Sequence, residues 1–130
     1  MATQNPPIGS ALDHFKLLCD YIKFHLGLYL ATPPVFAVIA KALGQKVIAS
    51  PYFLSGFAVL VGLCFVSGVC ASWFMGRHLN RSWETGESVD WDADASNLRR
   101  RFLHHYLYWF GLVAALAGLI AAAITAPAPT

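Results

Sequence analysis

The chain has 130 residues, of which 57% are apolar and 12% are charged, with a formal net charge of +2. A soluble globular domain carries roughly 25% charged residues. The composition therefore argues against an ordinary soluble domain and predicts one compact membrane unit. The small net charge also argues against a nucleic acid as the partner.

The N-terminal region predicts an arm followed by a helix on the membrane surface. Residues 1–9 contain Pro6, Pro7 and Gly9 without an apolar period, which predicts a flexible arm. Residues 10–23 place apolar side chains at helical spacing beside a charged stripe of alternating sign. This pattern predicts an amphipathic helix that lies on the bilayer.

The same helix is expected to enter the bilayer as a first span over residues 24–43. Pro33 and Pro34 interrupt this stretch, and each removes a backbone donor from the helix. We therefore expect a kink or a break here, and a re-entrant segment is the competing interpretation. A break would make this point a candidate ion or substrate site, whereas a packed kink would have no such role.

Two further spans are predicted with regular helical character. The stretch from Phe53 to Met75 has no charged side chain and is long enough, at about 1.5 Å per residue, to cross a bilayer. With Ser50 and Pro51 as its N-cap and first residue, this span covers residues 51–76. The third span is predicted over residues 98–126, and residues 127–130 form a tail.

A polar loop is expected between these two spans, over residues 77–97. Its carboxylates alternate as in a calcium loop, but the glycine and the bidentate glutamate that such a loop needs are missing, which excludes that site. The acidic residues and the arginines that open the next helix are instead candidates for binding a partner or anionic lipid headgroups. These candidates are Asp90, Asp92, Asp94, Arg99, Arg100 and Arg101.

Charge counting predicts the orientation. Seven of the nine basic residues lie on the side of the N-terminus and the polar loop, and two, Lys41 and Lys46, lie on the other side. The positive-inside rule then predicts a cytoplasmic N-terminus and an external C-terminus in a bacterial-type inner membrane.

Small residues recur every four positions in both regular spans, and such rows let helix backbones approach closely in lipid. Two interpretations remain open: the rows face each other within one chain, or at least one of them joins chains into an oligomer. The residues are Cys64, Gly68, Ser72 and Gly76 in the second span and Ala114, Gly118 and Ala122 in the third.

Five histidines form the other group with possible chemistry. Two imidazoles from different helices at one depth are what b-type haem ligation requires, so His25, His78 and His104 or His105 are alternative haem ligands. The competing interpretation is that these histidines, together with His14, lie in the headgroup region as solvated amphipathic side chains.

The sequence therefore predicts an all-α integral membrane protein of three transmembrane helices preceded by an amphipathic helix. No hydrolase, zinc-protease or phosphate-loop motif occurs, so we expect no enzyme and no required cofactor. The expected function is assembly through small-residue helix faces, either with itself as a pore, channel or effector or as an accessory subunit of a larger membrane complex. The alternative is a haem-binding membrane anchor for electron transfer.

Overall fold

The computed structural model describes residues 8–85 and 95–125, and every element in these two ranges is a helix. The elements are α1 (Ile8–Leu43), α2 (Gln45–Ile48), α3 (Pro51–Thr85) and α4 (Ala95–Thr125). The all-α fold class is confirmed. The acidic residues Asp90, Asp92 and Asp94, most of the predicted arm and the tail lie outside the described residues.

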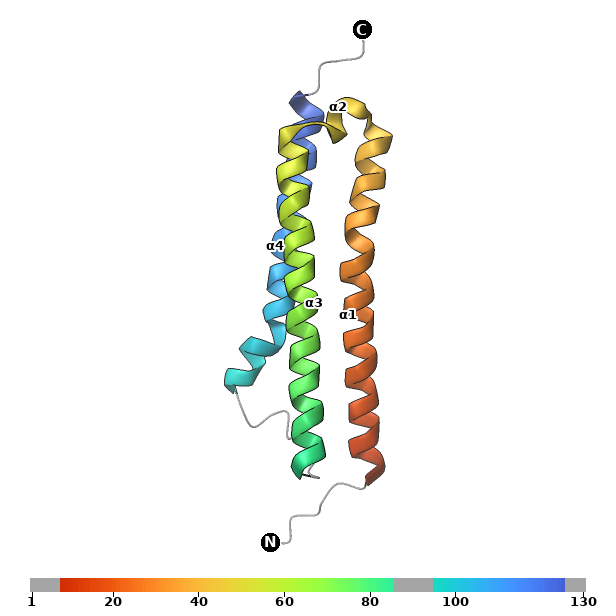
Figure 1. The fold of residues 1–130 in the computed structure, drawn as a ribbon, viewed down its shortest axis with the longest axis vertical. Helices are drawn as coiled ribbons and strands as arrows, with labels where there is room; N and C mark the ends of the chain where they lie inside the picture. The colour runs from red at the N-terminus through yellow and green to blue at the C-terminus, as the bar shows by residue number, and fades with distance from the viewer. Residues whose placement is uncertain (1–7, 86–94, 126–130) are drawn as a thin grey trace.

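Three of these helices are long and apolar enough to cross a membrane. The qualifying segments are Lys16–Leu43 in α1, Pro51–Arg77 in α3 and Phe102–Thr125 in α4. Figure 1 shows the three helices running along the long axis of the molecule, with the short α2 at one end. Their number and order agree with the three predicted spans.

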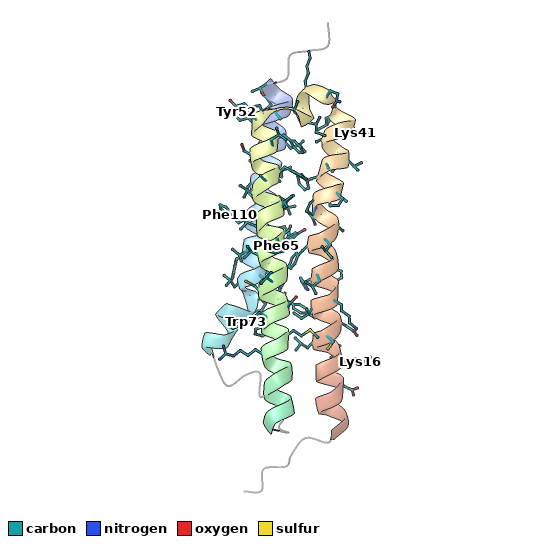
Figure 2. All side chains as sticks on the ribbon, viewed as in Figure 1. Lys16, Lys41, Tyr52, Phe65, Trp73 and Phe110 are labelled. Atoms are coloured by element: carbon teal, nitrogen blue, oxygen red, sulfur yellow. The ribbon has the colours of Figure 1, made fainter. Side chains whose placement is uncertain are left out.

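Helix α1 continues without a break through Pro33 and Pro34, so the expected break is not found. The residue before the prolines contributes a local side-chain bond, since the Thr32 hydroxyl donates to the carbonyl oxygen of Leu28 at 2.7 Å. In Figure 2, Lys16 and Lys41 lie toward opposite ends of this helix, which runs the length of the molecule beside α3. The kink stays a prediction.

The connection between α1 and α3 is a short turn built around Gly44. This residue has φ of 116°, a left-handed conformation that favours glycine. Its carbonyl oxygen accepts hydrogen bonds from the backbone amides of Val47 and Ile48 in α2. As predicted, α3 begins at Pro51, and the carbonyl of Ser50 accepts the first helical bond, from Leu54.

The polar loop is shorter than predicted. Helix α3 continues to Thr85 and α4 begins at Ala95, so residues 77–85 and 95–97 are helical. Polar residues do not by themselves end a helix, and the segment 77–85 contains neither glycine nor proline. The apolar stretch of α3 ends at Arg77, but the helix itself continues to Thr85.

Helices α3 and α4 pack as a close antiparallel hairpin. A Cβ atom added at Gly118 would lie 2.5 Å from the carbonyl oxygen of Tyr52, and one added at Gly56 would lie 2.6 Å from that of Ala114. The two backbones are therefore nearly in contact at these glycines, as small residues allow. We call this pair of helices the hairpin.

Helix α1 packs less extensively than the hairpin. In the most apolar 18-residue stretch of α1, 11% of the residues are buried inside the structure, against 28% in the corresponding stretch of α3 and of α4. Two buried clusters connect it to the hairpin. The first includes Ile22, Tyr29, Leu60, Cys64 and Tyr108, and the second comprises Ala40, Val47, Phe53, Leu119 and Ala122.

Candidate functional site

A row of polar side chains follows the inner face of α1 and meets a second row at the start of α4. Spacings of four, four and three residues place the α1 members on one side of the helix. We call the two rows together the polar cluster. Its members are Tyr21, His25, Tyr29 and Thr32 from α1 and His104, His105 and Tyr108 from α4.

At the end of the cluster nearest the N-terminus of α1, Tyr21 joins α1 to α4. Its hydroxyl is hydrogen-bonded to Nε2 of His105. Its backbone carbonyl accepts a bond from Nδ1 of His25 at 2.7 Å. A carbonyl oxygen only accepts, so His25 carries a proton on Nδ1.

The inner part of the cluster makes two further links between these helices. The hydroxyl of Tyr29 and Nδ1 of His104 are 2.5 Å apart, and both groups are buried. The hydroxyls of Thr32 and Tyr108 are 3.0 Å apart. Because the Thr32 proton is used by the Leu28 carbonyl, Tyr108 is the donor in this pair. Each such bond contributes about 0.5–1.5 kcal/mol.

The three imidazoles of the cluster are packed against one another. The rings of His104 and His105 stack with centroids 4.4 Å apart. The His25 centroid lies 4.5 Å from that of His105 and 5.6 Å from that of His104, with the planes close to perpendicular. These three histidines of α1 and α4 therefore lie in contact with one another, and His25 and His104 are buried.

As packed, these rings do not fit a haem. Metal–imidazole bonds of about 2 Å would put the centres of two ligating rings roughly 6 Å apart, with the porphyrin plane between them. His25 and His104 approach that separation, but His105 is in contact with both of them. A macrocycle would have to displace His105. We therefore derive no haem chemistry from this cluster.

Two buried polar atoms are without a hydrogen-bond partner in the described part of the chain: Nε2 of His104 and Oγ of Ser67. Their residues are 1% and 0% exposed. In the antiparallel hairpin Leu60 faces Gly111. Ser67 comes seven residues after Leu60, and His104 comes seven residues before Gly111, which is the same direction along the bundle. The register therefore places the two unpartnered groups at the same level of the bundle.

The predicted small-residue row of α4 is used within the chain. Gly118 contacts the backbone of Tyr52, Ala114 lies against Gly56, and Ala122 is buried in the second core cluster. The partner surface on α3 is not the predicted row, because it is centred on Gly56 and Leu60.

The predicted row of α3 is divided between the interior and the surface. Cys64 is buried, and a Cβ at Gly68 would make ordinary contact with Leu26 of α1 at 3.6 Å. Ser72 and Gly76 are exposed, and no described residue lies within 4 Å of a Cβ added at Gly76. Among the described residues, the second half of this row therefore makes no close packing contact.

The remaining predicted residues are placed only in part. Arg99, Arg100 and Arg101 belong to the first turns of α4, and His78 belongs to α3, but their side chains lie outside the described part of the structure. Cys19, Cys64 and Cys70 are free cysteines. Among the side chains that the structure describes, no three histidine, cysteine or acidic groups are placed to hold a metal ion.

Sequence reasoning missed the tyrosines and Thr32 of the cluster and the hairpin glycines Gly56 and Gly111. The signal for the α1 residues was present, because their spacing repeats that of a helix face. Tyrosine and threonine are common in apolar helices, so this spacing alone does not distinguish them from ordinary packing residues.

Comparisons of the chain with protein-family models, with curated proteins and with solved structures found no match.

Proposed function

We propose that this chain is a non-enzymatic, three-span protein of a bacterial-type inner membrane that acts by assembling with further copies of itself or with a larger membrane complex. Its N-terminus and the 86–94 segment lie in the cytoplasm in this proposal, and its C-terminus lies outside. Three helices can scarcely enclose a pore alone, so a pore or channel role would require several copies.

The distribution of apolar side chains supports insertion into lipid. Large apolar residues are exposed around all three long helices, including Phe65, Phe110 and Leu30 at 73%, 68% and 77%. A soluble monomer rarely exposes such continuous apolar surface. Figure 2 labels Phe65 on α3 and shows Phe110 on the side of the hairpin away from α1. Near the end of the apolar part of α3, the Arg77 guanidinium lies 5.5 Å from the ring centre of Trp73, a pairing suited to a membrane interface.

The exposed half of the α3 small-residue row is the observation that carries the assembly proposal. The small residues of α4 already pack against α3, whereas Ser72 and Gly76 are exposed, and no described residue lies within 4 Å of a Cβ added at Gly76. In lipid, helices associate by close backbone approach where side chains are small. Small side chains at these two positions would allow a helix from a second chain to approach closely.

The test is the mass of the purified protein in a mild detergent, compared with that of the Gly76→Leu variant. We expect an oligomer for the unmodified protein and a shift toward monomer for Gly76→Leu, because a bulky side chain at this position blocks close approach. Gly27→Leu is the matched control, since Gly27 of α1 is also exposed with nothing within 4 Å of its Cβ position, but lies outside the row.

A monomer at every protein concentration would contradict self-assembly. An oligomer that Gly76→Leu leaves intact would instead exclude this surface as the contact. Copurification of a second membrane protein in place of further copies would support the accessory role.

A further inference from the structure

We propose that His25, His104 and His105 form a proton-operated latch, which holds α1 against the hairpin while the imidazoles are neutral and releases that end of α1 when they bind protons. The inference rests on the proposed membrane location, because it assumes that α1 lies in lipid beside the hairpin. It concerns the regulation of the bundle, a property separate from assembly.

The geometry of the rings favours the neutral state. Three imidazoles lie within 4.4–5.6 Å of one another, measured between centroids. Neutral rings at these distances stack and make edge contacts. Protonated rings at the same distances would be like charges in contact, in an interior that screens charge poorly.

Among the side chains that the structure describes, no carboxylate faces the cluster. The titratable side chains that face it are Tyr21 and Tyr29 from α1, Tyr108 from α4, and Cys64 from α3, which shares a core cluster with Tyr29. All of these are neutral in their ordinary forms. The nearest charged groups along α1, Asp20 and Lys23, are exposed.

His104 is the least able to accept a proton in place. It is 1% exposed, Nδ1 is bonded to Tyr29, and Nε2 has no partner among the described residues. A protonated His104 would donate from both nitrogens, and Ser67 at the same level offers a hydroxyl but no charge. Burying a charge without a counter-charge is costly, so protonation favours an arrangement that exposes this ring.

Helix α1 is the element that would move. Only 11% of the residues in the most apolar stretch of α1 are buried, whereas α3 and α4 are in backbone contact at Gly56 and Gly118. The other end of α1 packs through Ala40 into a cluster without titratable side chains, completed by Val47, Phe53, Leu119 and Ala122. That end stays attached and acts as the hinge when the histidine end is released.

The latch can be tested by measuring distances between spin labels on the full-length protein in lipid nanodiscs. One label pair reports the histidine end through Leu17→Cys of α1 and Leu103→Cys of α4. A second pair reports the hinge end through Leu43→Cys and Ile124→Cys. All four positions are exposed, and the native cysteines are replaced by alanine.

When the pH is lowered from about 7.5 to about 4.5, we expect the main distance of the first label pair to become longer. This range takes a water-exposed imidazole, with its ordinary pKa of about 6.5, from neutral to protonated. The second pair is expected to stay unchanged. The triple variant His25→Asn, His104→Asn and His105→Gln keeps amide hydrogen bonding without an ionisable ring, and we expect it to lose the pH response. His14→Gln, outside the cluster, is the control that should keep it.

A first-pair distance that is the same at both pH values would overturn the latch, as would a pH response that persists in the triple variant. If the triple variant does not fold, the single change His105→Gln, at a half-buried ring, should weaken the response, and an unchanged response would again overturn the proposal. Failure of the membrane proposal would look different, because the protein would then stay soluble without detergent and would not enter nanodiscs.

Discussion

Single atoms decide how closely α3 and α4 approach each other. At Gly118 and Gly56 the opposite carbonyl oxygen already occupies the place of a side chain, with 2.5 and 2.6 Å to the Cβ position. Gly111 is less tight, at 3.2 Å from Cβ of Leu63. Backbone atoms cannot rotate out of the way as the end of a flexible side chain can. The hairpin therefore depends on glycine at two positions in particular.

We predict that Gly118→Ala lowers the free energy of unfolding by about 1–3 kcal/mol, as overpacking does elsewhere, because the two helices must separate to admit one methyl group. Thermal or denaturant unfolding in detergent, followed by circular dichroism, measures this. Gly62→Ala is the matched control in the middle of α3, where nothing lies within 4 Å of the added Cβ. It should be neutral or stabilise by up to about 1 kcal/mol through helix propensity. Equal effects of the two changes would contradict the close contact at Gly118.

The sequence predicted part of this residue-scale picture. The four-residue spacing identified Gly118, Ala114 and Ala122 because small residues on one face are visible in a pattern. It did not identify Gly56 as the counterpart, since the relative shift of two antiparallel helices depends on how all side chains at the contact fit. The sequence offered contact between His25 and His104 or His105 only as an alternative, and it did not indicate the tyrosines that bind these histidines.

At the scale of elements, α1 shows that prolines do not have to end a helix. The two rings at Pro33 and Pro34 remove the donors that would reach the carbonyls of Tyr29 and Leu30. The helix is nevertheless continuous over 36 residues. Its packing on the hairpin on both sides of the prolines, through the two core clusters, offsets the lost bonds.

We predict that Pro33→Ala raises the free energy of unfolding by up to about 3 kcal/mol, because alanine restores a backbone donor within a helix that is already formed. The same unfolding measurement in detergent applies. Pro51→Ala is the control, because Pro51 is the first residue of α3, where the missing donor has no helical partner, so its replacement should have little effect. A loss of stability in Pro33→Ala would show that the proline geometry itself is required at this point.

The ends of the elements were harder to predict than their number. The three long helices follow from apolar runs of sufficient length, and α3 starts at Pro51 as its capping residues indicated. The polar end of α3 was missed because hydropathy reports where a helix leaves an apolar environment. It does not report where the backbone stops being helical. Helix α3 ends at Thr85, and the next residue in the sequence is Gly86, a residue type common just after helix ends.

Across the whole molecule, a closely packed hairpin is combined with a more loosely packed α1. The hairpin is held by backbone contact, whereas α1 is held by two apolar clusters and by hydrogen bonds between tyrosine or threonine and α4. A difference of this kind between elements is where conformational change is expected to begin. Assembly through α3 and movement of α1 would use separate faces of the bundle.

In the proposed topology, three helices cross the membrane, so the two ends of the chain lie on opposite sides of it. The most direct measurement is cysteine labelling by a membrane-impermeant reagent in intact cells, with single cysteines introduced into a cysteine-free chain. We predict that Gln45→Cys, exposed in α2, is labelled from outside, and that Ser88→Cys is labelled only after the membrane is permeabilised. Equal labelling at the two positions, or recovery of the chain in the soluble fraction, would contradict the account.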